Sequence, residues 1–323
     1  MVRAALWLSG LLPFEQAQVV LREIGHFDIS RDSIWRISQK WGAKFQGLEN
    51  KEREQAHALP EKGRPPSRAE VDRRMGVAMD GMMLHLRQEG WKELKLGAVF
   101  DLAVRPASDE RRKEWVELAH AVHNSYVAHL GGPEMLGQLL WAEAQRRGWE
   151  QAQDSQAIGD GAVWIWNLVA WHFEGSRQLV DWYHAKQHLA EAARLFKGEG
   201  TTRYTLWLNS RETALYQGQA EQIACELEQA TPYKPEWADD LRREAGYFRQ
   251  NAKRMNYLEM REEEYVIGSG MVEGGAKQYQ ARLCGPGMHW SRTGAQHLIP
   301  IRTAILSDRF DERWREAQNL PQT

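Results

Sequence analysis

The order of its predicted secondary structure is the feature that most constrains how this chain folds. Three strand-like segments follow one another, GVAMDGMMLHLR, LKLGAVFDLAV and NSYVAHLGG. The first is nearly continuous apolar sequence, as in a strand buried on both faces, and the second alternates with a strand's period of two. Helices then alternate with two further strands, DSQAIGD and RQLVDW. This order predicts an α/β protein with a mixed five-stranded sheet flanked by helices, antiparallel first and parallel afterwards.

The segments before the sheet predict a small helical region and a linker. We expect helices within residues 1–50, where DISRDSIWRISQKWG predicts a helix capped near Ser30. This pattern is similar to the second half of a helix-turn-helix, and a small structural bundle is the alternative. Residues 51–70 are charged and rich in proline, so we expect a linker there.

The long stretch after the fifth strand predicts an all-helical insertion. Apolar residues recur there at spacings of three and four, which is the period of a helix face. We therefore expect the core that contains the sheet to be interrupted. Its first part spans residues 71–190, the insertion spans 191–262, and the C-terminal helices of the core span 263–323.

Composition excludes several classes of protein. With 42% hydrophobic and 27% charged residues, the chain is an ordinary globular protein and is not disordered. It has no run of about 20 apolar residues that would cross a membrane, and its opening lacks a signal-peptide cleavage site. The two cysteines are far apart in sequence, which excludes a zinc ribbon and fits a reducing, cytoplasmic location.

The net charge of −2 argues against a nucleic-acid binder that is basic as a whole. Lysine and arginine nevertheless cluster in AKRMNYLEMR and in KQYQAR, while acids gather elsewhere. A basic groove on a neutral protein is therefore one interpretation of these clusters, and solvated helix faces are the other.

Three acids occupy positions that call for a partner. Asp80 lies in the middle of the first buried strand, and Asp160 ends the fourth strand between two glycines. A buried carboxylate costs several kcal/mol unless it is paired or binds a metal. If the first and fourth strands are neighbours, both acids converge at one edge, where a hard divalent cation would relieve their repulsion.

The third acid is Glu273, in the first turns of a predicted helix that follows GSG. Lys277, four residues later, shares its helix face and would reach a phosphate beside the metals. Each acid also has a simpler interpretation. Asp80 would pair with an arginine, Asp160 would cap the following helix, and Glu273 would be solvated.

Five segments together resemble the DDE transposases of bacterial insertion sequences, in a group with a helical insertion in a ribonuclease H-like domain. The resemblance covers roughly residues 74–323. The segments that carry it are MDGMML, IGDGAVWIWN, LVDWYHAKQHL, GSGMVEGGAKQ and GPGMHWSRTGAQHLIPIRTAIL. It implies a ribonuclease H-like fold for the sheet. It also implies that Asp80, Asp160 and Glu273 are the catalytic and metal-binding acids.

The motif DWYH, Asp181 to His184, resembles the acid-x-x-His motif of transposases with helical insertions. We expect both residues to fix the end of the strand to the insertion. His184 as a metal ligand is the alternative.

The resemblance implies phosphoryl transfer on DNA without a covalent intermediate. Two Mg²⁺ ions about 3.5 to 4 Å apart, or Mn²⁺ in their place, would activate water and stabilise the leaving oxygen. The same site would cut transposon-end DNA and join the freed 3′-hydroxyl to target DNA. The active form would then be at least a homodimer, acting at the bacterial nucleoid. The alternatives are a ribonuclease H-like nuclease without strand transfer and a domesticated DNA-binding relic without catalysis.

Basic and aromatic side chains outside the acids are candidates for DNA contacts. An exposed indole at Trp290, beside Arg292, would stack on an unpaired base, whereas core packing is the equal alternative. The expected DNA-binding residues are Lys277, Arg282, Trp290, Arg292, Arg249, Lys253 and Arg254.

Overall fold

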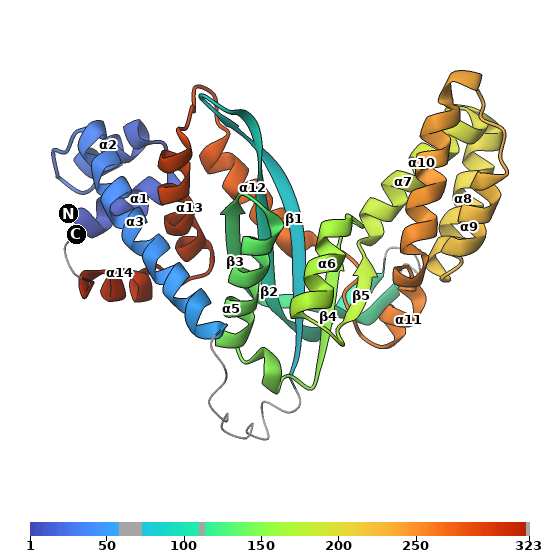
Figure 1. The fold of residues 1–323 in the computed structure, drawn as a ribbon, viewed down its shortest axis with the longest axis horizontal. Coiled ribbons are helices and arrows are strands. Elements are labelled where there is room, and N and C mark those ends of the chain that lie inside the picture. Colours follow the sequence, from blue (N-terminus) through green and yellow to red (C-terminus); the bar gives the residue numbers. More distant parts are fainter. Residues whose placement is uncertain (58–72, 110–113, 321–323) are drawn as a thin grey trace.

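A five-stranded sheet forms the centre of the protein in a computed structural model that describes residues 1–57, 73–109 and 114–320. The strand order is β3-β2-β1-β4-β5; β2 pairs antiparallel with both β1 and β3, and β4 pairs parallel with both β1 and β5. The predicted mixed α/β sheet flanked by helices is therefore confirmed (Figure 1). The strands are β1 (Arg74–Leu86), β2 (Gly90–Asp109), β3 (Glu114–Leu130), β4 (Asp154–Gly159) and β5 (Arg177–Val180).

The second and third strands are longer than the sequence pattern predicts. The segment expected as the third strand begins at Asn124, whereas β3 begins ten residues earlier in the chain, at Glu114. Its first half pairs with the far end of β2, from Leu102↔Ala121 to Asp109↔Glu114. The partner strand supplies these hydrogen bonds, so the local pattern alone does not reveal them.

Helices cover both faces of the sheet. A side chain at Gly97 of β2 would lie 2.8 Å from Leu140 of α5 (Pro133–Arg146), so α5 covers that face. On the opposite face, a side chain at Gly275 of α12 (Gly270–Leu283) would lie 2.6 Å from Tyr126 of β3. The remaining flanking helices are α6 (Val163–His172) and α13 (Arg292–Leu306).

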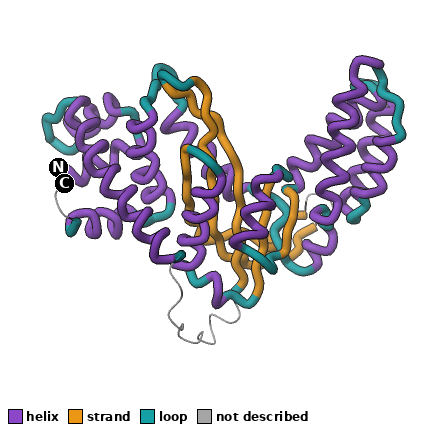
Figure 2. Tube along the Cα trace, in the orientation of Figure 1, coloured by secondary structure: helices purple, strands orange, loops and turns teal. Residues whose placement is uncertain are grey.

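An arm of helices leaves the sheet directly after β5 and returns before α12 (Figures 1 and 2). Its first helix starts at Trp182 rather than at residue 191, and every residue between 191 and 262 is described and lies in a helix, turn or loop. The arm consists of α7 (Trp182–Lys197), α8 (Thr202–Tyr216), α9 (Ala220–Glu228), α10 (Ala238–Asn251) and α11 (Tyr257–Glu262).

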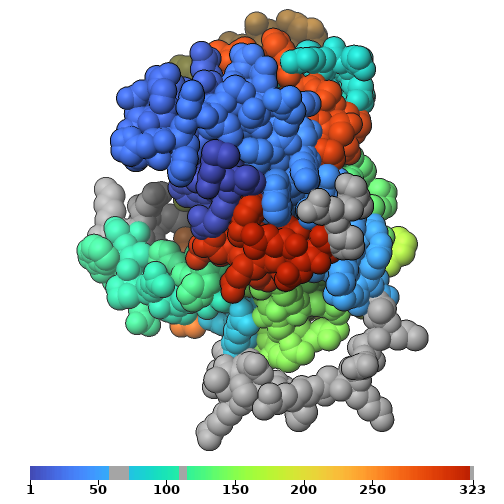
Figure 3. Space-filling view, turned by 90° about the vertical axis from the view of Figure 1, so that its left-hand side faces the viewer, coloured from blue at the N-terminus to red at the C-terminus, as the bar shows by residue number. Residues whose placement is uncertain are grey.

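The N-terminal helices pack against the C-terminal ones, as the contact between blue and red segments in Figure 3 shows. The Ser30 side chain accepts from Ser33 N–H at 3.2 Å, which confirms the predicted cap. The helix it begins continues to Ala56, so a linker starting at residue 51 is wrong, and residues 58–70 lie outside the described residues. These helices are α1 (Val2–Leu11), α2 (Phe14–Glu23), α3 (Arg31–Ala56) and α14 (Phe310–Gln318).

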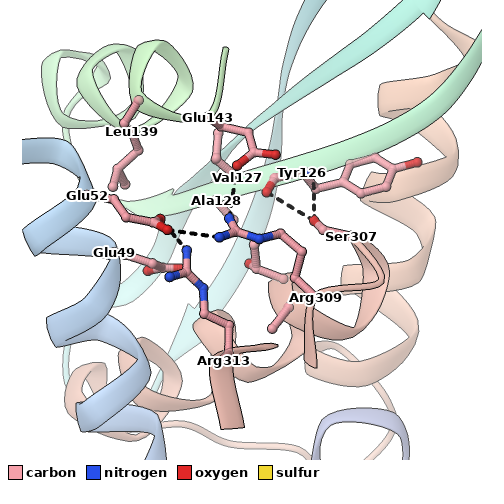
Figure 4. Close-up of a pocket in the computed structure, with 13 residues that line it drawn as sticks. Glu49, Glu52, Tyr126, Val127, Ala128, Leu139, Glu143, Ser307, Arg309 and Arg313 are labelled. Atoms are coloured by element: carbon pink, nitrogen blue, oxygen red, sulfur yellow. Dashed lines mark hydrogen bonds and ion pairs between the residues drawn. The ribbon is translucent and has the colours of Figure 1, made fainter. Parts of the chain in front are cut away.

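A cluster of charged side chains joins α3 to α5 and to the start of α14 (Figure 4). Arg309 donates to Glu52 at 2.8 Å and to Glu143 at 3.1 Å, and Arg313 also donates to Glu52. Arg146 also pairs with Glu143, and Glu312 and Glu316 pair with Arg309 and Arg313. With Glu49, which lies among these groups, the cluster holds five carboxylates and three guanidinium groups. The cluster thus holds the N-terminal helices on the core with a surplus of acid.

Among the described residues, no helix combines the length and apolar character that a membrane-spanning segment needs.

Candidate active site at the carboxyl edge of the sheet

Three aspartates follow one another across neighbouring strands. The parallel register of β1 and β4 ends at Ala78↔Ile158, and two residues further along both strands it brings Asp80 beside Asp160. The register of β4 and β5 ends at Gly159↔Val180, so the next residue of each strand brings Asp160 beside Asp181. The Asp181 N–H donates to the Gly159 carbonyl at 2.7 Å, which continues the ladder to this point.

Glu273 approaches the same place from the helix above the sheet. The register pairs Ala78 with Ala98, whose partner on β3 is Tyr126, so this face of β1 is the one that α12 covers. Tyr126 fixes the start of α12 by donating to the Met271 carbonyl at 3.2 Å. Because side chains alternate along a strand, Asp80 shares this face with Ala78. Glu273 thus comes from the helix that covers the face of Asp80.

The electrostatics of Asp80 reflect these neighbours. Burial is the main cause that raises its pKa, and the nearby negative charges of Asp160 and Glu273 raise it further. A hydrogen bond from Gly81 N–H and the proximity of His184 act in the opposite direction. The structure therefore brings together the three acids that the sequence singled out, close enough for their charges to interact.

Each of the three carboxylates has one oxygen in a hydrogen bond. Asp80 accepts from Gly81 N–H at 2.7 Å, Asp160 from Ala162 N–H at 2.8 Å, and Glu273 from the Ser269 hydroxyl at 3.1 Å. Within the described parts of the chain, the second oxygen of each has no hydrogen bond, and none of the three forms an ion pair. The arginine partner considered for Asp80 is thus not found there, and three oxygens remain available to a ligand.

Asp181 plays a different part, because both of its oxygens are in use. The residue is fully buried and accepts from His184 N–H at 2.7 Å and from Ser269 N–H. It therefore caps α7 at the start of the arm and holds the residue before α12. One ligand atom each from Asp181, His184 and Glu273 lies within 4.8 Å of the others, whereas among the described residues Asp80, Asp160 and Glu273 do not form so close a group. The two backbone bonds of Asp181 favour its interpretation as an anchor over that of a metal ligand.

Two residues that the sequence analysis did not single out also hold the site. Ser269 positions Glu273, and its place four residues before the acid is visible in the sequence as helix spacing. Tyr247 of α10 donates from its hydroxyl to the Asp160 carbonyl at 3.0 Å and stacks on His188 at 3.6 Å. Burial and the charge of Asp160 raise the pKa of Tyr247, so it stays a donor. No local pattern signals Tyr247, which lies 87 residues from Asp160.

The basic residues expected to contact DNA differ in their availability. Lys277 and Lys253 are exposed, and neither forms an ion pair with any residue that the structure describes. Arg249 pairs with Glu228 at 2.7 Å and with Glu221 at 3.0 Å. Another candidate near the end of the arm has a half-buried guanidinium group that donates to a glutamine of β5. This residue is Arg254, 2.7 Å from Gln178.

The C-terminal candidates require a correction. Trp290 is 7% exposed and its indole N–H donates to the Leu283 carbonyl at 2.8 Å, so the expected exposed indole is wrong and core packing holds. Arg282 is 1% exposed, which excludes an open surface contact, and Arg292 pairs with Glu89 at 2.6 Å. The cause is the N-terminal helices, which cover the connection between α12 and α13 and which no local pattern places there.

The fold and site together define an α/β protein with a cluster of acids at the carboxyl edge of a mixed sheet. No known family model matches the sequence. A comparison with curated proteins likewise yields no significant match.

Proposed function

We propose that this protein is a DDE transposase, similar to those of bacterial insertion sequences, with a ribonuclease H-like catalytic domain. It would cut transposon-end DNA and join the 3′-hydroxyl ends to target DNA. The observation that carries the proposal is the convergence of Asp80, Asp160 and Glu273, each with an unengaged carboxylate oxygen. The strand order, with β1 between β2 and β4, supports it because ribonuclease H-like sheets have this order.

The donor set fits Mg²⁺ or Mn²⁺. Hard divalent cations bind carboxylate oxygens in proteins, and the three available oxygens belong to Asp80, Asp160 and Glu273. Burial is the main cause of the raised pKa of Asp80, and the charges of Asp160 and Glu273 add a repulsion that a cation would relieve. When bound, such ions supply a Lewis acid that activates water and stabilises the leaving oxygen of a phosphodiester.

The chain's own residues would keep this donor set in place. The Ala162 N–H fixes one oxygen of Asp160, and Tyr247 holds the backbone of the same residue. Ser269 orients Glu273 through its hydroxyl, while Asp181 holds the backbone of Ser269. Preorganised ligands of this kind reduce the rearrangement needed when substrate binds.

Cleavage by the full chain tests the proposal. The substrate is a supercoiled plasmid that carries the genomic DNA flanking this gene, with Mg²⁺ or Mn²⁺ present. Asp80→Asn, Asp160→Asn and Glu273→Gln should each lower the nicking rate by at least about a hundredfold, because each removes a metal ligand. Glu174→Gln, a neutralised exposed acid just after α6, is the matched control and should cleave like the parent. Equal cleavage by all five proteins would contradict the proposal.

Joining separates a transposase from a nuclease of the same fold. Pre-cut duplexes with free 3′-hydroxyl ends are incubated with a target plasmid, and joined products are counted. Joined products are expected from the parent and not from Glu273→Gln. Cleavage without joining would instead establish the nuclease, and DNA binding without either activity would establish a relic.

Concerted joining of two ends also requires at least a homodimer on DNA, acting at the bacterial nucleoid. Sedimentation of the complex with end DNA should therefore show two or more chains.

A further inference from the structure

A cavity of about 360 Å³ is lined in part by the N-terminal helices, which lie on the opposite side of the sheet from the helical arm (Figure 1). It is bounded by the N-terminal helices, the turn between β1 and β2, and the loop that joins α12 to α13. Figure 3 views this side, where the blue N-terminal helices lie beside orange and teal segments. Three of the residues that line the cavity are arginines, and none of its described lining residues is acidic.

Arg282 lines this cavity as a buried cation. It is 1% exposed, and its guanidinium group lies 5.0 Å from the ring of Phe14 and 5.2 Å from that of Trp290. Its Nε donates to the Ser9 carbonyl at 2.8 Å, but Nη2 is buried without a hydrogen-bond partner in the described residues.

Nothing among the described residues neutralises this charge. Burial and the like charge of Arg302 lower the pKa of Arg282 to about 9, and no carboxylate opposes them. Arg282 therefore stays charged at neutral pH while lacking a counter-ion. A buried charge without a partner is strongly destabilising, so an anion in the cavity would supply the missing partner.

Two further arginines stand at the exposed rim. Arg87, in the turn after β1, donates from Nε to the His289 carbonyl at 3.1 Å. Among the described residues, the side chain of Arg31 makes only a 3.3 Å contact with the adjacent Asp32, and both side chains are mostly exposed. Exposed pairs of this kind are worth about 0 to 1 kcal/mol, so Arg31 can turn to another anion at little cost.

Three helices begin at the cavity. The lining includes Phe14 at the start of α2, Arg31 at the start of α3, and Ser291, which caps α13. These helices have 10, 26 and 15 residues. Helix N-termini carry a partial positive charge, which favours anions and phosphate in particular. Side chains already accept from one N–H of α13 and from two of α3.

We propose that this cavity is a phosphate-binding site, with Arg31 and Arg87 as the contacting residues and Arg282 as the buried charge beneath them. The phosphate belongs either to the backbone of nucleic acid or to a free phosphate compound. Trp35, also in the lining and 44% exposed, offers a ring beside the phosphate on which a base can stack. The site is separate from the cluster of acids, so it does not rest on the proposed cleavage.

Thermal unfolding of the full chain in inorganic phosphate tests the site, with ionic strength held constant by sodium chloride. Arg31→Gln/Arg87→Gln removes the rim charges. The matched control is Arg22→Gln/Arg242→Gln, because both of these arginines are exposed and form similar local pairs outside the cavity. Phosphate should raise the Tm of the parent and the control, since a ligand of the folded state stabilises it.

In the rim variant, the apparent Kd for phosphate should rise by at least about tenfold, because two charge-assisted contacts are lost. Arg282→Met should lose the phosphate response as well, and the rim variant decides the matter if that protein does not fold. A parent Tm that does not respond to phosphate, or a response that the rim variant keeps, would overturn the proposal. The Tm of Asp160→Asn must respond to phosphate like that of the parent, because Asp160 lies outside this cavity. A failure of the proposed cleavage therefore leaves the phosphate response unchanged, and the two proposals are tested separately.

Duplex DNA identifies the source of the phosphate. Fluorescence anisotropy measures the affinity for a short duplex between about 50 and 200 mM salt, where each phosphate contact contributes about 0.9 to the salt slope. If the site holds a backbone phosphate, the rim variant should lose about one to two from this slope and the control should lose none. An unchanged slope together with a lost response to inorganic phosphate assigns the site to a free phosphate compound.

Discussion

Replacing Glu49 by glutamine should stabilise the protein at neutral pH. Glu49 lies in the charged cluster of Figure 4, in which carboxylates outnumber guanidinium groups. Part of the residue is exposed, but its carboxyl group lies among the charged groups of the cluster. Burial there raises its pKa from 4.5 to about 8; Arg313 opposes the rise and the charge of Glu52 adds to it.

The sign and the size of the effect follow from this pKa. A carboxyl group with a raised folded-state pKa destabilises the protein once the pH exceeds the unfolded value of 4.5, and the cost grows until the pH reaches about 8. At pH 7 the difference is about 2.5 pH units, at about 1.4 kcal/mol each, which gives roughly 3.5 kcal/mol. Glutamine keeps the shape of the side chain and has no proton to lose, so this cost disappears.

Thermal and urea unfolding from pH 4.5 to 8.5 measure the effect. The stability of Glu49→Gln relative to the parent should rise with pH across this window and level off above about pH 8.

Glu52→Gln is the control on the same helix with the opposite sign. Burial opposes ionisation of Glu52, but hydrogen bonds from Arg313 and Arg309 outweigh it and lower its pKa. Stability from Glu52 is therefore present above pH 4.5 and lost as the pH falls, and Glu52→Gln should destabilise the protein by about 1 to 3 kcal/mol near neutral pH. A Glu49→Gln variant that is less stable than the parent at pH 7 would refute this account of the cluster.

Three further predictions concern the acids and their supports. Asp160→Asn keeps the acceptor for Ala162 N–H and removes a charge beside Asp80, so metal-free protein should gain about 1 kcal/mol and respond less to Mg²⁺. Melting with and without Mg²⁺ checks this, and a destabilised variant with an unchanged Mg²⁺ response would count against a shared site. Asp181→Ala leaves two buried N–H groups without acceptors and should cost about 2 to 4 kcal/mol in urea unfolding, whereas Asp181→Asn should cost less. Tyr247→Phe keeps the ring and loses the bond to the Asp160 carbonyl, so about 1 kcal/mol of stability and part of the Mg²⁺-dependent nicking should be lost while DNA binding is unchanged.

The strands of the sheet could be predicted where the pattern of apolar residues within the strand itself indicates them. An apolar run marked the first strand and two-residue alternation marked the second, because these patterns reflect which faces of a strand are buried. The first half of β3 lacked such a signal, since it owes its conformation to pairing with the far end of β2. The end of α3 was misjudged because the charged stretch that begins at residue 51 was taken for a linker, whereas the helix continues through it to Ala56.

Two acids of the candidate site could be recognised from the sequence because of the residues around them. Asp80 and Asp160 are anomalous within apolar strands, so each drew attention without any knowledge of the fold. The residues that hold these acids in place could not be recognised in the same way. Tyr247, which donates to the Asp160 carbonyl, lies 87 residues away in the sequence, near the end of the arm. Trp290 and Arg282 were misjudged for the same reason. Local pattern shows which face of a helix is apolar, but not which distant segment covers it.

The arm is joined to the sheet in a way that explains how so large a segment leaves the acids undisturbed. Asp181 accepts one bond from His184 N–H, where the arm begins, and one from Ser269 N–H, after the arm has returned. A single carboxylate thus holds both ends of the arm together, and a segment whose ends meet can be inserted into a domain with little effect on its core. Because Ser269 also orients Glu273, the anchor that closes the arm sets the position of an acid in the candidate site. A change in how the arm packs would therefore alter the position of Glu273 through the hydrogen bonds of Asp181 and Ser269, while the strands stay in place.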